Sequence, residues 1–335
     1  MKRSIISIIS RYALVALMMV TVISSCGLIY EDLEKCPRGV TLRFVYDYNM
    51  EYANAFHTKV DCVTLYVYDG NGNYVTTCTE SGSKLSDESY RMVVDLPNGD
   101  YHFVAYGGMG CEAETFSTVA EPREGSHLNA LQVEMDHQEY ISDIKHHDHY
   151  HGTLDVTIES DMYKDCTLYL KKNTNNLRVV MQQLNYEPLY GEDFIFRVVD
   201  KNTLHDHRNE PVSDKEVTYR PWAQGESVLQ VKSQGEEQQP LQVAYAEFSM
   251  SRLHTDNNPR LIIERKEDNK VVVDIPLNDY LMLLKSMQHG KLSPQEYLDR
   301  ESDWSMVFFL DEVRNWWQVH IVVNGWTVRL NNIGL

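Results

Sequence analysis

The chain has 335 residues and carries 49 Asp and Glu against 31 Lys and Arg, which gives a formal net charge of −18 at pH 7. Such an acidic chain argues against nucleic acid or anionic lipid headgroups as partners, because both require neutralising basic side chains. The GxSxG, HExxH and Walker-type glycine motifs of common enzyme classes are missing from the sequence. We therefore expect no enzyme activity, no cofactor and no nucleic-acid partner.

The N-terminal segment has the composition of a bacterial secretion signal. It holds three basic residues and no acidic one, followed by an apolar run that ends at Ile23-Ser24-Ser25-Cys26. An aliphatic residue three positions before a cysteine, with two small residues between them, is the lipobox pattern in which the cysteine is lipidated. A membrane span needs ~20 apolar residues, so this run is too short for one. The sequence predicts a lipoprotein signal peptide over residues 1–25, lipidation of Cys26 and a tether over residues 26–36. An ordinary signal peptide is the alternative.

Five further cysteines lie in the predicted mature chain, and their number is odd. Complete internal pairing is therefore impossible outside the cytoplasm, and none of them has CxxC spacing. Both a disulfide and buried free thiols fit the pattern, so the pairing stays open. These residues are Cys36, Cys62, Cys78, Cys111 and Cys166.

Alternating apolar and polar residues predict half-buried strands through the first half of the chain. Turn residues at 70–73 and 97–100 connect neighbouring strands into two hairpins. The expected strands are residues 40–48, 60–69, 74–78, 90–96, 101–106, 128–136, 152–159 and 166–171.

A polar run at residues 171–176 predicts a boundary between two domains, 37–172 and 173–335, since the mature chain is long enough for two of ~150 residues each. Strands are expected in the second domain at 177–184, 194–199, 217–220, 242–251, 260–264 and 271–275, with polar loops at 201–215 and 224–240. Apolar periodicity predicts a helix over 277–288, and Ser293 and Glu296 predict the start of a shorter helix at 294–300. Strands 316–323 and 326–330 form a closing hairpin around Asn324-Gly325. The fold class is mainly β, with two tandem β-sandwiches and one or two short helices in the second.

Four of the thirteen histidines crowd into residues 146–151. On an extended chain His147, His149 and His151 share one face, and imidazoles are ligands for Zn²⁺, Ni²⁺ or Cu²⁺. A metal site needs converging ligands with an oriented second layer of partners, and we find no Cys or Glu close by in the sequence. We therefore favour a solvent-facing loop, with the three histidines as weak metal-ligand candidates.

Three tryptophans near the C-terminus allow two interpretations, core packing or a platform for carbohydrate or protein. They are Trp316, Trp317 and Trp326. Because Trp317, Val319 and Ile321 would share one strand face, the pattern favours core packing.

Several short motifs follow the lipobox in a characteristic order. Cys36-Pro37 leads into the first strand, which is followed by YDYNM at 46–50, LYVYD-GNG-Y at 65–74, LPNGDY at 96–101, AYGG at 105–108, KNTNN at 172–176 and the hairpin between Trp316 and Trp326. The series resembles the FimB-like anchor subunits of Bacteroidales fimbriae over nearly the whole mature chain.

The resemblance implies two transthyretin-like sandwich domains and a lipid anchor on Cys26 in the outer membrane, exposed at the cell surface. It implies a non-enzymatic protein that anchors a fimbrium, limits its length and engages fimbrial structural subunits by β-strand addition, in which main-chain hydrogen bonds supply affinity. A surface glycan-binding or nutrient-capture lipoprotein is the alternative function.

The first and last strands are the expected partner strands, because chain ends can exchange strands without rethreading the fold. Both carry alternating apolar side chains that fill pockets in a partner. The candidate residues are Val40, Leu42, Phe44 and Tyr46 at one end, and Val328 and Leu330 at the other. If neither strand binds the partner, the loop at 201–215 is the expected interface.

Overall fold

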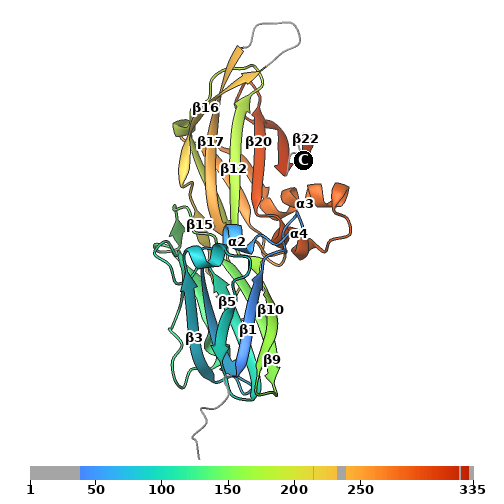
Figure 1. The fold of residues 1–335 in the computed structure, drawn as a ribbon. Coiled ribbons are helices and arrows are strands. Elements are labelled where there is room, and N and C mark those ends of the chain that lie inside the picture. The colour runs from blue at the N-terminus through green and yellow to red at the C-terminus, as the bar shows by residue number, and fades with distance from the viewer. Residues whose placement is uncertain (1–37, 214, 232–238, 324–325, 332–335) are drawn as a thin grey trace, which may run out of the picture.

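A computed structural model describes residues 38–213, 215–231, 239–323 and 326–331 as an elongated molecule of two β-rich halves stacked end to end (Figure 1). The mainly-β prediction is confirmed. Cys26 and Cys36 lie outside the described residues. Within the described ranges no helix is both long enough and apolar enough to cross a membrane.

The first half packs a three-stranded sheet, in the order β10-β1-β4, against a five-stranded sheet, in the order β11-β9-β5-β2-β3. Leu42, Phe44, Leu65 and Phe103 are buried together between the two sheets. The elements are β1 (Gly39–Val45), α2 (Phe56–Lys59), β2 (Cys62–Asp69), β3 (Tyr74–Ser81), η2 (Ser83–Ser86), β4 (Met92–Asp95), β5 (Gly99–Gly107), β9 (Tyr150–Ile158), β10 (Tyr163–Tyr169) and β11 (Lys171–Lys172).

The five-stranded sheet of this half is covered on both faces. Tyr66 and Tyr106 project from the face opposite the first core and join a second hydrophobic cluster. That cluster continues through Phe116 into the core of the second half. Burial on both faces explains why β2 is buried along its length except at Asp69. One apolar cluster therefore extends from this face of the sheet into the second half, while the first core remains separate from it.

The second half packs a six-stranded sheet, in the order β16-β17-β12-β20-β21-β22, against a five-stranded sheet, in the order β19-β18-β13-β15-β8. Its strands are β12 (Thr174–Gln183), β13 (Phe194–Asp200), β15 (Val217–Tyr219), β16 (Ala223–Val231), β17 (Gln239–Ser251), β18 (Arg260–Arg265), β19 (Val271–Pro276), β20 (Asp303–Leu310), β21 (Trp316–Val323) and β22 (Trp326–Asn331). The helical elements are η4 (Gly191–Asp193), α3 (Leu277–Gln288) and α4 (Pro294–Arg300). Ser293 Oγ accepts from the Glu296 N–H at 3.2 Å, so the predicted N-cap of α4 is present.

Short segments cross between the two halves. Strand β8 (Ile141–Ser142) pairs with β15 in the second half, whereas β14 (Leu204–Asp206) pairs with β7 (Gln132–Met135) beside the first half. β7 also pairs with β6 (Phe116–Thr118) and is preceded by the single turn η3 (Leu128–Ala130). The predicted boundary at residue 172 lies between β11 and β12, yet these crossings tie the halves together on either side of it.

The strands differ from those expected in two places. Residues 224–240 were expected to form a polar loop, but β16 and the start of β17 occupy most of the range, because an edge strand can carry polar residues on its exposed side. The sequence reading also missed β20, which lies between β12 and β21 in the centre of its sheet. Alternate residues Trp304, Met306 and Phe308 are buried along it.

The predicted core position of Trp317 was also wrong. Phe309 is opposite Gln318 while Leu310 is opposite Trp316, so a β-bulge falls at Trp317. The bulge leaves the indole 53% exposed, whereas Trp316 packs on the core.

Candidate partner-binding groove

The first predicted partner strand is not an edge in this structure. β1 pairs with β10 in parallel on one side and with β4 antiparallel on the other. Val40, Leu42 and Phe44 are buried, and Tyr46, just after the strand, is also buried. The expectation that a strand at the chain end would lie at a sheet edge fails here, because β10 returns from far along the sequence to cover it.

The second predicted partner strand does lie at an edge. β22 pairs only with β21 among the described residues, with Val328 opposite Ile321 and Leu330 opposite Val319. One side of its main chain is therefore open to another strand.

The sequence reading missed a third strand with an open side, β13. On one side it pairs with β18 from Phe194 to Val199. On the other side β15 covers only Val198–Asp200, and no strand in the described ranges continues along Phe194–Arg197. Main-chain groups alternate in direction along a strand, so those of Phe196 point towards this open side together with those of Phe194 and Val198.

Pro221 explains why β15 stops. Val198 is opposite Tyr219, so an extension of the same register would place Pro221 opposite Phe196. Proline has no N–H to donate to a ladder. The chain instead turns away, and the Trp222 N–H donates to Glu247 O, 3.0 Å away, in the other sheet of this half.

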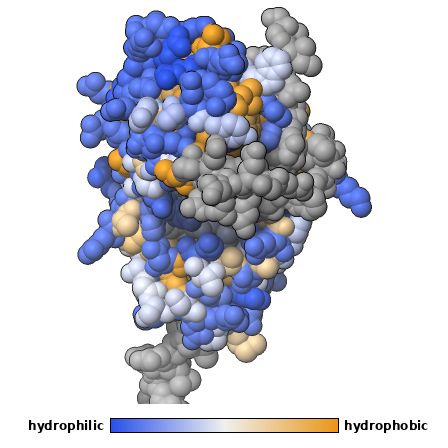
Figure 2. All heavy atoms as spheres, turned by 90° about the horizontal axis from the view of Figure 1, so that it is seen from above, coloured by the Kyte–Doolittle hydropathy of each residue, from blue (hydrophilic) through white to orange (hydrophobic). Residues whose placement is uncertain are grey.

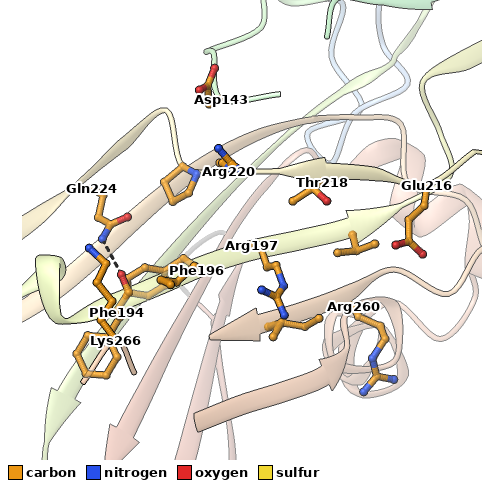
Figure 3. A pocket seen from close by; sticks show the side chains of 14 residues that line it. Asp143, Phe194, Phe196, Arg197, Glu216, Thr218, Arg220, Gln224, Arg260 and Lys266 are labelled. Atoms are coloured by element: carbon orange, nitrogen blue, oxygen red, sulfur yellow. Dashed lines mark hydrogen bonds between the residues drawn. The ribbon is translucent and has the colours of Figure 1, made fainter. Parts of the chain in front are cut away.

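A hollow of about 950 Å³ opens beside the unpaired part of β13 (Figure 3). Arg197 projects from β13 between Thr218 and Arg220 on one side and Arg260 on the other. Ile195, 39% exposed, supplies an apolar side chain to the lining. The hollow is thus an open strand position bordered by both apolar and charged groups.

The Gln224 side chain occupies part of the missing strand's place. Its Nε2 donates to Gly191 O at 2.5 Å and to Phe194 O at 3.2 Å. The Gly191 N–H in turn donates to Glu226 Oε1 at 2.9 Å. One end of the open edge is therefore satisfied by a side chain and not by a neighbouring strand.

The charge around the hollow differs from that of the whole chain. Arg197 forms a bidentate pair with Glu264, at 2.7 and 3.1 Å, and Arg260 pairs with Asp274 at 2.6 Å. Arg220 and Lys266 make no ion pair within the described residues, although both line the hollow. The acidic groups in the lining are Asp143 and Glu216. An otherwise acidic protein thus presents two uncommitted cations here.

The histidine segment is not the solvent-facing loop that we expected. His146, His149 and His151 are 4%, 2% and 5% exposed, because the segment lies between the two halves. The His149 ring stacks on Phe116 with centroids 4.2 Å apart, while His151 Nε2–H donates to His207 O at 3.0 Å. The predicted ligands His147, His149 and His151 therefore do not converge on one point.

Burial holds these rings neutral. Loss of solvation lowers the pKa of His146 and of His151 to about 4, and that of the neighbouring His205 to about 3. The pKa of His149 falls well below its ordinary range for the same reason, with the nearby histidines adding to the effect. The His147 ring lies closer to the surface, where its Nε2 is 2.9 Å from Asp61 Oδ1.

The structure resolves the cysteine alternatives for the residues it describes. Cys62 and Cys111 form a disulfide, while Cys78 and Cys166 are free, partly buried thiols. Burial raises the pKa of both free thiols, which keeps them protonated and unreactive.

Figure 2 shows one end of the molecule. Seen along the long axis from the second half, it is predominantly hydrophilic, with hydrophobic residues in small separate areas (Figure 2). The fold and the groove together place the chain in the class of elongated tandem β-sandwich proteins.

Comparisons with known proteins identify the family within this class. Residues 33–332 match the family described as fimbrillin-A associated anchor proteins Mfa1 and Mfa2. The chain belongs to this family. No curated protein matches it.

Three solved structures are similar over most of their length. A candidate adhesin from Bacteroides thetaiotaomicron shares 46% identity and a TM-score of 0.82, with 90% of this chain and 100% of that one covered. A candidate polysaccharide-binding protein from the same organism shares 32% identity and a TM-score of 0.74, with 88% and 98% covered. The fimbrial anchor protein Mfa2 from Porphyromonas gingivalis shares the fold, with 15% identity, a TM-score of 0.66, and 88% and 99% covered.

Proposed function

We propose that this protein is a non-enzymatic outer-membrane lipoprotein that anchors a fimbrium to the cell surface and limits its length. Lipid on Cys26 holds it in the membrane, and fimbrial structural subunits bind it by β-strand addition. Its family supports the anchoring role. The observation that carries the binding mechanism is the unpaired side of Phe194–Arg197 on β13.

A partner segment would enter this groove as an extended strand. The Phe196 N–H and C=O offer main-chain hydrogen bonds, and the segment's own carbonyls and amides replace the Gln224 amide at Phe194. Alternate side chains of the segment lie beside Ile195 or point away from it. Because Arg220 and Lys266 lack carboxylate partners within the described residues, we expect an acidic residue in the segment.

A charge placed in the groove tests this mechanism. Ile195→Glu brings a carboxylate to the open edge and should abolish co-purification of fimbrial subunits from outer membranes. Val228→Glu is the matched control, since Val228 is a 60% exposed strand residue of the same half outside the hollow. Equal co-purification with both variants would remove the groove from the proposal.

The open edge at β22, which the sequence predicted as a partner strand, is tested separately. Val328→Pro removes a main-chain donor and fixes φ in the edge strand. If this variant localises and loses subunits while Ile195→Glu retains them, the added strand binds β22 rather than β13.

The anchoring role is tested at Cys26. Cys26→Ala should abolish labelling with fatty acid and release the protein from the outer membrane, and fimbriae should then be shed. Continued labelling and membrane fractionation of this variant would show that another segment holds the membrane. Deletion of the whole protein should also give abnormally long fimbriae, and fimbriae of unchanged length would remove the length-limiting role.

Glycan capture is the second candidate function. It is favoured by the exposed Trp317 indole, because exposed aromatic faces stack on sugars, and by the polysaccharide-binding description of one relative. Trp317→Ala should then weaken binding of the purified protein to a polysaccharide array. If the array shows no binding by the unaltered protein, this candidate is excluded for the glycans presented.

A further inference from the structure

Four potential metal ligands meet beside the histidine segment. Asp61 immediately precedes β2, and Cys62 is its first residue. Cys111 follows β5, and His147 precedes β9. One ligand atom from each lies within 4.8 Å of all the others. His147 Nε2 is 2.9 Å from Asp61 Oδ1 and 3.8 Å from Cys111 Sγ.

The loop that carries Cys111 is held in place by its glycines and by hydrogen bonds. The Gly108 N–H donates to Cys62 O at 2.9 Å. Gly110 has φ +90°, and a Cβ there would come within 2.5 Å of Thr79. The Gly110 N–H donates to Glu114 Oε2 at 2.6 Å, which anchors the loop just before Cys111.

The main chain of His147 is held by a hydrogen bond that does not involve Cys111. Its main-chain N–H donates to Thr115 Oγ1 at 3.0 Å, and the Nε2 atom faces Asp61 and Cys111. The main chain on both sides of the group is thus fixed without help from the Cys62–Cys111 bond, so the ligands should stay together when that bond is broken.

We propose that these four residues form a reduction-dependent site for Zn²⁺ or a similar thiophilic divalent ion. Two thiolates, one imidazole and one carboxylate form a four-ligand set of the kind that zinc prefers. In the oxidised protein the disulfide links the segment at Cys62 to the loop that carries Cys111. In the reduced protein the metal ion links them instead.

The exchange between the two states balances as follows. A dithiol transfers two electrons and two protons to the Cys62–Cys111 disulfide, the S–S bond breaks, and the dithiol closes to its own cyclic disulfide. Zinc binding then releases the two thiol protons to solvent, because thiolates are the ligands.

The movement that this requires is small. Tetrahedral Zn–S bonds of ~2.3 Å place two sulfurs about 3.8 Å apart. The Cα atoms of Cys62 and Cys111 are 5.8 Å apart, so rotation of the two side chains can supply the change without displacing either loop. The Cys62 side chain is fully buried, which protects its thiolate once the metal is bound.

Cobalt(II) provides a direct spectroscopic test. The protein is reduced with a dithiol, freed of it by anaerobic gel filtration and titrated with Co²⁺. We expect one equivalent to bind with thiolate-to-cobalt charge-transfer absorption and the ligand-field bands of a tetrahedral site. The oxidised protein should show neither signal. Reduced protein without these bands would overturn the proposal.

Variants separate a built site from binding to the two thiols alone. His147→Ala should weaken cobalt binding by at least the roughly tenfold that even a lost outer-shell partner costs. The matched control is His102→Ala, because His102 also pairs with a carboxylate, Asp155 at 2.6 Å. Asp61→Asn should weaken binding without unfolding the protein, since its side chain is 59% exposed. Unchanged affinity in both His147→Ala and Asp61→Asn would also overturn the proposal.

Discussion

Strands β1 and β13 have similar sequences of alternating apolar residues, but they differ in how their main chains are used. β1 has β10 beside it over Gly39–Val45 and β4 beside it over Gly39–Leu42, and its alternate side chains from Val40 to Phe44 are buried. β13 has one full neighbour, β18, and one that ends after three residue pairs. β1 is therefore an inner strand with buried side chains, whereas β13 leaves part of one side unpaired beside a hollow that Ile195 lines. On the proposed mechanism, the place for a partner follows from an incomplete sheet and not from the position of a strand in the sequence.

A proline in β1 should have the largest effect of any change considered. Leu42→Pro removes a ladder donor from a central strand and also a fully buried leucine, whose loss alone costs about 2–5 kcal/mol. The first half should unfold, which the urea midpoint would show. Ile195→Glu on β13 should change the free energy of unfolding by only ~0.5 kcal/mol, as surface substitutions do. Equal stability losses at both sites would erase the distinction between the closed and open strands.

The buried ion pair of the second half should give the next largest effect. Arg252 and Asp299 form two hydrogen bonds of 2.7 and 2.9 Å, with both side chains almost fully buried. Asp299→Asn leaves the guanidinium uncompensated and should cost about 3–5 kcal/mol. Asp274→Asn breaks the half-exposed pair with Arg260 at the groove and should cost less than ~1 kcal/mol. The free energies of unfolding of the two variants, measured with denaturant, compare a buried ion pair with a half-exposed one.

The buried histidines should make the junction between the halves sensitive to acid. Folding holds His146, His151 and His205 neutral, while the unfolded chain binds protons below its ordinary pKa of about 6.5. Their contribution to stability is complete above pH 6.5 and is lost as the pH falls towards 4. Burial raises the pKa of Asp200 to about 6 and also raises that of Glu301. These two carboxyl groups act in the opposite direction to the histidines, because they stabilise the folded protein as the pH falls.

His149 offers a variant that isolates this pH dependence. Neither of its buried ring nitrogens has a hydrogen-bond partner among the described residues, and its pKa lies well below the ordinary range. His149→Phe keeps a ring between Phe116 and Tyr106 and should flatten the decline of the urea midpoint between pH 6.5 and 4. A steep decline that persists in His149→Phe would assign the acid sensitivity to other groups.

The link between the loop after β1 and the second half should give the smallest effect. The Arg300 guanidinium lies 4.1 Å from the Tyr48 ring centroid and 4.4 Å from that of Tyr52. Arg300→Lys keeps the charge but loses most of the stacking, which should cost ~1 kcal/mol. A measured loss well above that of Asp299→Asn would show that this surface contact, and not the shared core, joins the halves.

Local signals predicted a large part of the fold. The hairpin of β2 and β3, the Ser293 cap of α4 and most other strands follow from alternation, turn residues and capping chemistry, all of which act over a few residues. β20 was missed although every second residue is apolar, because nothing local shows that two other strands will enclose it. β16 was missed because an exposed edge strand has the polar composition of a loop.

The candidate sites were harder to predict because each depends on contacts between segments that are far apart in the sequence. The groove depends on β15 ending before Pro221 would come opposite Phe196, and that register exists only after β13 and β15 have paired. Pro221 was a visible signal, since proline ends a ladder, but its partner was not. The burial of the histidine segment likewise depends on the packing of two halves, and the ligands that meet His147 come from residues 61, 62 and 111.

Photocrosslinking in the groove tests the central claim most directly. A photoreactive amino acid is placed at position 195, and in a matched strain at position 228, in cells that assemble fimbriae. After irradiation, mass spectrometry should identify a covalent adduct between position 195 and an extended segment of a fimbrial subunit, and no such adduct from position 228. Adducts from position 228 alone, or none at position 195 while subunits still co-purify, would contradict strand addition at β13.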